Sequence, residues 1–350
     1  MPNPPLVSTN ANTCWLLLAG QAEPRHLSDI VVAVQALRER GVPDANIFVF
    51  AEHQLLARHL TPYGVTRVFP ARALVTEAPK IAGFELAVLV VTGHGDGAGI
   101  SMNAGGSMNP AGVLAAVRSC PGIKAGVVVL CQCFAGLFHY ADADKVPGAA
   151  DLCVLGATNL NPSLSFTSNT PAFVKKADGS PAFPNWEANV FMFRLFEWLV
   201  QPQDVDGDGL FTLMDAHKHA GVKSNDDLRD VKRRQHAAIG ELESNVLRKV
   251  RELTSAMASQ DPQRFQNSLL ALVAADELLS SALENLHLLQ EPWILNARLA
   301  KQIEFPRPVT AAAAAQQQPA TGAPSDATAP ASAPAPAPVS PGAAVPQTGP

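Results

Sequence analysis

Short, almost wholly apolar runs recur through the first 160 positions of the chain. They are Cys14–Ala19, Ile47–Phe50, Leu86–Thr92, Ala125–Cys131 and Leu152–Ala157. A run that is apolar at successive positions places side chains of the same kind on both faces of a strand, which is typical of a parallel sheet covered by helices on both sides. These runs therefore predict five strands of a mainly parallel sheet.

Helical periodicity separates several of these runs. Between His26 and Arg40 the apolar residues recur at helical spacing, and Gly41 provides a stop signal. A second helix is predicted after Asn109 and Pro110, because asparagine is a good N-cap and proline suits the first helical position. The alternation of strands and helices predicts an α/β fold, a three-layer sandwich.

The pattern changes to long helices after the middle of the chain. An apolar segment at 187–200 predicts a buried helix. Ser224 is a candidate N-cap for the next helix, with acids behind it, and Asp261-Pro262 is a second cap before a Leu-rich helix at 269–289. We expect a helical hairpin that packs on the core or on another chain.

These patterns divide the chain into four parts. We expect a flexible N-terminus at 1–12, an α/β domain at 13–223, a helical region at 224–304 and a disordered tail at 305–350. The tail is rich in proline and alanine and has almost no charge, so it cannot bury enough apolar surface to fold. A passive tail is favoured over a ligand for a proline-binding module.

Composition narrows the classes of function. The 350 residues are 47% hydrophobic and 16% charged with a net charge of −5, which predicts a globular protein and argues against nucleic acid as the main partner. No apolar run is long enough for a membrane helix, and no signal-peptide pattern is present, so we expect a soluble, cytoplasmic protein without a membrane partner. Five cysteines in separate apolar runs argue against a disulfide framework.

Two of the predicted strands end in residues that carry chemistry. The strand at 86–92 runs into Gly93-His94-Gly95, and the strand at 125–131 runs into Cys133, with Gly136 close behind. The carboxyl ends of parallel strands share one edge of a sheet, and the segment between them is long enough for one helical crossover. His94 and Cys133 are therefore expected to lie side by side.

An imidazole beside a thiol can perform acyl transfer. His94 would accept the thiol proton of Cys133 and later donate it to a leaving amine. The backbone N–H groups of Gly95 and Cys133 would stabilise the oxyanion. Each residue alone is more simply a structural histidine or a buried thiol, but the two together at glycine-flanked strand ends favour a catalytic pair.

The ordered set of motifs resembles the caspase–legumain–metacaspase superfamily of cysteine endopeptidases. His94-Gly95 and the segment Cys133-Phe134-Ala135-Gly136 match the superfamily's two strand-end signatures. Upstream, Arg25-His26 with Asp29, and the segment Gly41-Val42-Pro43-Asp44, are similar to the legumain pattern. The resemblance covers about residues 13–165 and implies a caspase-like fold and a Cys-His dyad that cleaves protein or peptide substrates.

The resemblance also implies a binding site for the substrate side chain. Arg25 matches an arginine that binds this side chain, and Ser163 and Ser165 lie in the segment that would complete the pocket. Cys131 stands where legumains and metacaspases have an acid. An arginine without an acid weakly favours a carboxylate side chain, although Ser165 stands where caspases have a further arginine. The alternative for Arg25 is a surface residue at the start of a helix.

An acidic segment after the predicted 187–200 helix fits a twelve-residue calcium loop. Asp204, Asp206 and Asp208 would supply carboxylate oxygens, Leu210 a carbonyl oxygen, and Asp215 the last ligand in place of the usual glutamate. The interpretation is a structural Ca²⁺ site with weakened binding, and the alternative is a plain acidic turn. The resemblance supports it, because similar loops occur in bacterial legumain-like peptidases.

The sequence therefore predicts a cysteine endopeptidase with a structural Ca²⁺ site. The alternative is a catalytically silent protein of the same fold that acts through the helical region 224–304 and the Pro-rich tail. A third hypothesis makes the acidic loop a calcium switch for the peptidase. The region 224–304 is a candidate surface for a protein partner in each case.

Overall fold

The computed structural model describes residues 5–21, 23–51, 59–103, 105–141, 147–182, 185–287 and 290–307. The tail that the sequence predicts to be disordered lies outside the described residues from position 308 onward, as do positions 1–4 of the N-terminus. Within the predicted flexible N-terminus, residues 6 and 7 form the short strand β1 (Leu6–Val7).

A seven-stranded sheet forms the centre of the structure, in the order β13-β10-β9-β5-β2-β3-β4. The strands are β2 (Thr13–Ala19), β3 (Ile47–Ala51), β4 (Val68–Phe69), β5 (Leu86–Thr92), β9 (Ala125–Leu130), β10 (Asp151–Gly156) and β13 (Trp293–Leu295). All neighbours are parallel except β13, which runs antiparallel to β10. The five predicted strands are confirmed, and β4 and β13 were not predicted.

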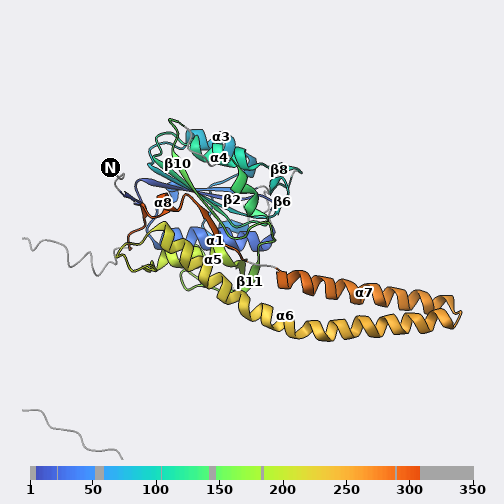
Figure 1. Cartoon of the computed structure of the whole chain (residues 1–350). Coiled ribbons are helices and arrows are strands. Elements are labelled where there is room, and N and C mark those ends of the chain that lie inside the picture. The colour runs from blue at the N-terminus through green and yellow to red at the C-terminus, as the bar shows by residue number, and fades with distance from the viewer. Residues whose placement is uncertain are drawn as a thin grey trace, which may run out of the picture. The chain divides into compact units, whose positions relative to one another are not determined.

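Helices cover both faces of this sheet. Figure 1 shows α3 (Leu74–Glu77) and α4 (Pro110–Arg118) on one side, and α1 (Pro24–Glu39) and α5 (Val190–Val200) on the other. Alternate residues of β2 enter the two layers: Trp15 and Leu17 pack with α1 and α5, whereas Leu16 packs with α3 and α4. The protein is thus α/β with a mainly parallel sheet between helical layers, as its sequence predicts.

Local signals explain where several elements begin and end. The side chain of Asn109 accepts a hydrogen bond from the Gly112 N–H at 2.8 Å, so the predicted cap of α4 is confirmed. Gly41 follows α1 with φ +78°, a conformation that favours glycine at the end of a helix. Short 3₁₀ helices span Asp44–Asn46, Thr61–Tyr63, Ala71–Ala73, Ala78–Lys80 and Ala135–Tyr140.

The predicted helix start at Ser224 is wrong. Helix α6 (Leu213–Ala258) begins directly after the acidic loop, where Thr212 and Asp215 form a capping box, and it continues through Ser224 without a break. The boundary predicted between residues 223 and 224 therefore falls inside one helix. Helix α7 (Pro262–His287) follows α6, and Asp261 caps it by accepting from the backbone N–H groups of Gln263 and Arg264.

The region predicted as helical up to residue 304 returns to the sheet after α7. Strand β13 pairs with β10, helix α8 (Ala297–Ala300) follows, and β14 (Ile303–Glu304) pairs with β1. The helical prediction is therefore wrong for these last residues. Trp293 anchors the returning chain, because its Nε1–H donates to the Thr158 carbonyl at 2.8 Å and its ring lies against Gly156.

Two small antiparallel sheets lie beyond the ends of the central strands. One contains β6 (Gly95–Asp96), β7 (Gly99–Ser101) and β8 (Ser107–Met108), and the other pairs β11 (Ser165–Asn169) with β12 (Asn185–Asn189). Strand β12 occupies the start of the segment predicted as the 187–200 helix, so α5 begins at Val190.

The described residues bear on the predictions about disulfides and about membrane helices. All five cysteines are free, which agrees with the absence of a disulfide framework. Within the described part of the chain, every helix is too short or too polar to cross a membrane.

Candidate functional site

The carboxyl ends of β5 and β9 lie side by side. The two strands are parallel neighbours, with Val91 opposite Leu130, so His94 and Cys133 follow at the same edge of the sheet, as the sequence predicts. The segments after the strands also touch. A Cβ atom on Gly95 would lie 2.0 Å from the carbonyl oxygen of Cys133, so only glycine fits at this position.

His94 and Cys133 line the same small pocket, which measures about 250 Å³ including the part open to solvent. The other lining residues are Arg25, His26, Thr92, Gly93, Cys131, Ser163, Ser165 and Asn189. The structure therefore brings together the predicted catalytic pair and all three residues predicted to bind a substrate side chain.

The imidazole of His94 is held by Glu23. His94 Nε2 lies 2.6 Å from Glu23 Oε1, and the ring of His26 stands edge-on to it at a centroid distance of 5.1 Å. This hydrogen bond is the main reason why the pKa of the Glu23 carboxyl is lower than usual. When Nε2–H donates to the carboxylate, Nδ1 keeps the lone pair that can accept a proton.

Glu23 also pairs with Arg25. Its second oxygen, Oε2, lies 3.0 Å from Arg25 Nε, so one carboxylate bridges the candidate base and the candidate specificity arginine. The positive charge of Arg25 is thus already compensated within the pocket. This pairing weakens the expectation that Arg25 favours an acidic substrate side chain.

A tight turn holds Cys133 half-buried at the pocket. The next residue, Phe134, has φ +56°, a left-handed conformation that costs about 1 kcal/mol for a residue other than glycine. Its N–H donates to the Asn161 carbonyl at 3.1 Å, which fixes the turn against the neighbouring loop. From the same loop, the Ser163 N–H donates to the sulfur of Cys133 at 3.3 Å.

Two backbone amides, those of Gly95 and Cys133, are the predicted oxyanion donors, and Gly95 does not line the pocket. Ser101 N–H donates to the His94 carbonyl at 3.0 Å, so the next pair along, Gly95 and Ile100, is a non-hydrogen-bonded pair whose amides point away from each other's strand. The Cys133 amide has no acceptor among the residues that the structure describes. Both predicted oxyanion donors are therefore left without a partner from the neighbouring strand or loop.

A buried polar network around Asp29 connects several residues that line the pocket. Asp29, which is 1% exposed, accepts from Thr92 Oγ1 at 2.5 Å and from the Asn189 N–H at 2.6 Å. The side-chain amide of Asn189 donates to the Cys131 carbonyl and to Ser163 Oγ, both at 2.9 Å. The network thus ties α1 and β5 to the loops that hold Cys133.

Burial shifts the pKa values of three titratable groups in and beside this network. It raises the pKa of Asp29 to about 7, although its hydrogen bonds to Thr92 and Asn189 act in the opposite direction. Burial, with the Asp29 charge as a smaller cause, raises the pKa of the Cys131 thiol well above its usual value. Burial also lowers the pKa of His26 to about 4, so this imidazole is neutral at pH 7 and its Nδ1 accepts from the Glu23 N–H.

The raised pKa of Asp29 predicts a specific dependence of stability on pH. The Asp29 carboxyl ionises near pH 4 in the unfolded chain and near pH 7 in the folded chain. Its contribution to folding stability is therefore complete below pH 4 and is lost as the pH rises to 7. We expect the melting temperature of Asp29→Asn to rise relative to wild type across this window, corresponding to about 4 kcal/mol. A difference that is constant from pH 4 to 8 would contradict the shift.

Sequence reasoning missed Glu23 and Asn189. Asn189 had a readable signal, because it precedes the apolar helix α5 and its side chain caps that helix by accepting from the Met192 N–H. No sequence signal points to Glu23. Its contact with His94 joins two loops that are far apart in the sequence, and only the order of the strands in the sheet brings these loops together. Asp29 was noted within a motif but without a role.

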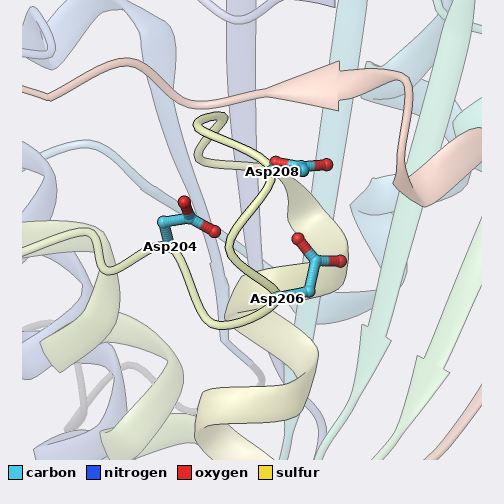
Figure 2. A group of neighbouring side chains, drawn as sticks. All are labelled: Asp204, Asp206 and Asp208. Carbon is cyan, nitrogen blue, oxygen red and sulfur yellow. The ribbon is translucent and has the colours of Figure 1, made fainter.

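The acidic loop brings three carboxylates together at the start of α6. One oxygen from each of Asp204, Asp206 and Asp208 lies within 4.8 Å of the others, and Figure 2 shows the three side chains around one turn of the loop. Carboxylate oxygens are the donors that Ca²⁺ prefers. Lys218 competes for this charge, because its Nζ lies 2.9 Å from Asp206 Oδ2 and lowers the pKa of Asp206.

Asp215, the predicted last ligand, does not join this cluster. The carboxylate of Asp215 is buried, with Oδ1 accepting from the Val205 N–H at 2.9 Å and Oδ2 accepting from Thr212 Oγ1 at 2.7 Å. It therefore closes the loop and caps α6 in this structure. Leu210 donates its N–H to Asp208 Oδ1 at 2.9 Å, and its carbonyl stays a predicted ligand.

Comparison with known proteins adds nothing to this geometry. No family model matches the chain, and no curated protein matches it at a significant level. The residues of the site are therefore the basis for the function proposed below.

Proposed function

We propose that the chain is a cysteine endopeptidase with a caspase-like fold, similar to the caspase–legumain–metacaspase superfamily. One observation carries the proposal. His94 and Cys133 line one pocket at the carboxyl ends of two adjacent parallel strands, and Gly95 touches the backbone of Cys133. This supports a nucleophile and a base in one small site, with the proposed oxyanion donor Gly95 beside it.

In the first half of the reaction, the sulfur of Cys133 attacks the carbonyl carbon of a peptide bond. The thiol proton passes to Nδ1 of His94, and the negative charge on the carbonyl oxygen is stabilised by the N–H groups of Gly95 and Cys133. The C–N bond then breaks, and His94 donates its proton to the departing amine. A thioester between Cys133 and the acyl part of the substrate remains.

In the second half, water hydrolyses this thioester. His94 accepts a proton from the water, and the resulting hydroxide attacks the thioester carbonyl. The tetrahedral intermediate again directs its oxygen toward the two amides. Breakage of the C–S bond releases the carboxylic acid, and the proton on His94 returns to the sulfur of Cys133.

Glu23 acts as a positioning residue for His94. It fixes the Nε2–H tautomer and stabilises the positive imidazolium that forms in each half-reaction. We expect Glu23→Gln to lower kcat by roughly tenfold to hundredfold while KM for the same peptide changes little.

The control for this prediction is Glu39→Gln at the exposed end of α1, which should leave both constants unchanged. Steady-state kinetics with one fluorogenic peptide separates the outcomes. A change in KM alone would show that Glu23 acts only on Arg25 and substrate binding.

The substrate side chain enters the pocket between Arg25 and the segment that contains Ser163 and Ser165. The test is to incubate the protein with a peptide library, with and without Ca²⁺, and to identify new termini by mass spectrometry. The proposal predicts cleavages that share a residue at the cleaved position. A library left intact under both conditions would contradict it.

We propose further that the Asp204, Asp206 and Asp208 cluster binds Ca²⁺ as a structural clip. Fixing the loop would fix the start of α6, since the loop leads directly into the helix. We expect millimolar Ca²⁺ to raise the melting temperature by roughly 3 to 6 °C. Asp208→Ala should remove this increase, whereas Asp230→Ala, outside the loop, should not.

Calorimetry with and without chelator measures this effect, and cleavage assays under the same conditions separate a clip from a switch. An unchanged melting temperature together with unchanged activity in the presence of Ca²⁺ would contradict the metal site. A change in activity without a change in stability would favour the switch hypothesis.

A separate observation supports the alternative function, which is a catalytically silent interaction protein. Large apolar side chains are exposed along α6 and α7, away from the pocket. The library assay distinguishes the two functions, because a silent protein would leave every peptide intact.

A further inference from the structure

The second part of α6 and all of α7 form an antiparallel hairpin (Figure 1). Among the least exposed residues of the two helices are small and aliphatic ones, and their burial indicates the line of contact between the helices. Among them, Ile239, Ala256 and Ala275 are buried, but Val246 and Leu272 are only half-buried. Two helices alone therefore leave the seam between them partly open to solvent.

Six large apolar residues lie exposed beside this seam, and we name them the hairpin face. They are Leu247, Val250 and Met257 on α6, and Phe265, Leu269 and Val273 on α7. Their exposed fractions range from 37% for Phe265 to 63% for Met257. Monomeric proteins rarely expose so many contiguous apolar side chains without a function.

The six residues share one side of the hairpin. A helix advances about 100° per residue, so the three on α6 are rotated by about 20° to 100° from the contact residue Val246. The three on α7 are rotated by about 20° to 100°, in the same sense, from Leu272. In an antiparallel pair, the same sense of rotation leads to the same side, so the two stripes form one continuous surface.

The opposite side of the hairpin is mainly polar, although Leu278 of α7 is exposed on it. Arg264 of α7 donates to Ser255 Oγ of α6 at 3.2 Å, and Arg248 donates to Glu252 at 2.8 Å. These two contacts lie within the hairpin. The asymmetry shows that the hairpin is amphipathic as a unit, which is the property of half a helix bundle.

We propose that the hairpin face binds the hairpin face of a second copy of this chain, forming a symmetric four-helix bundle. Six side chains of this size, about half exposed, offer on the order of 500 Å² per copy. Two copies that bury all of this area would bury about 1,000 Å², which is the lower limit for a specific interface. A two-fold axis lets the same residues serve both partners, and such dimers are the commonest oligomers. The proposal does not depend on the proposed peptidase activity.

The charge of α7 disfavours an anionic membrane as the occupant. The helix carries one arginine, Arg264, against the acids Asp276, Glu277 and Glu284. Helices that lie on membrane surfaces usually have a polar side rich in lysine and arginine. A second hairpin has no such requirement, because the hairpin face itself is uncharged.

The test is the mass of the full chain in solution, by light scattering after gel filtration and by sedimentation equilibrium. The wild type should have twice the mass of the chain at micromolar concentration. Val250→Lys combined with Leu269→Lys should raise the dissociation constant by on the order of 100-fold and give a monomer, since lysine would be buried without a partner. Helicity by circular dichroism should remain unchanged, because both positions are exposed.

The matched control is Leu278→Lys. Leu278 is 60% exposed on α7 but points to the opposite side of the hairpin, so this variant should remain a dimer. A wild type that is monomeric at 100 µM would overturn the proposal, and so would a dimer that survives the double substitution or is lost in Leu278→Lys. Binding of the wild-type monomer to anionic vesicles would identify a membrane as the occupant instead.

Discussion

Replacing Cys133 with alanine is expected to lower kcat/KM for peptide cleavage by about 10⁴-fold or more. The substitution removes the nucleophile, and His94 and the two amides cannot form the thioester without it. Cys133 is only half-buried and Ser163 contacts its sulfur at 3.3 Å, so the smaller alanine should fit without refolding the loop. Kinetic assays with a peptide found in the library measure the effect.

Cys131→Ala is the control for this variant. Cys131 is 1% exposed, two positions before Cys133, and its thiol has a pKa raised well above the usual range. The control should therefore cost some stability but leave kcat within a few fold of wild type. Equal loss of activity in both variants, or cleavage that survives in Cys133→Ala, would refute the assignment of the nucleophile.

Gly95→Ala is expected to have the second largest effect. A Cβ at this position would lie 2.0 Å from the Cys133 carbonyl oxygen and 2.9 Å from Gln132 Cγ, so the backbone of one strand end must move. Because the amides of Gly95 and Cys133 are the proposed oxyanion donors, this movement should lower kcat by about 10²- to 10³-fold. The close contact between Gly95 and the Cys133 backbone would also be lost, which should lower the melting temperature.

Gly97→Ala is the control that distinguishes an effect at the site from a general effect of replacing a glycine in this loop. This glycine lies two positions later, and a Cβ there would meet nothing within 4 Å. It should leave both kcat and the melting temperature near the wild-type values. The account would be contradicted if Gly95→Ala retained full activity, or if Gly97→Ala were equally damaging.

The central strands could be predicted because both of their faces are buried. Every residue of β2 and β5 is buried, so each strand is a continuous apolar run that stands out in the sequence. The strand β13 has only three residues at the edge of the sheet and is half-buried. Its place depends on the contact of Trp293 with Gly156, which has no local pattern.

The error at Ser224 has a similar physical origin. Ser224 followed by two acids is a valid start signal, but each acid has another partner in the structure. Asp226 pairs with Arg229 one turn later, and Asp227 accepts two hydrogen bonds of 2.8 Å from Arg194 on α5. The true start, at Thr212 and Asp215, was hidden because Asp215 was assigned to the metal loop.

The part of the candidate site that the strand topology alone determines could be predicted from the sequence. Parallel strands place their carboxyl ends together, so His94 and Cys133 could be paired from their positions after two apolar runs. The contacts of Glu23 with His94 and Arg25 depend on side-chain placement between loops, and no spacing rule gives them. The sequence thus located the site but not the residue that orients its base.

The most direct test of the proposed dyad is the rate at which iodoacetamide modifies each cysteine at neutral pH, followed by peptide mapping. The account predicts that Cys133 reacts first, ahead of the four buried cysteines, and that His94→Gln slows its modification by at least about tenfold, because the imidazole no longer takes the thiol proton. An equal rate in wild type and His94→Gln would show that His94 does not activate Cys133, and would contradict the proposed peptidase.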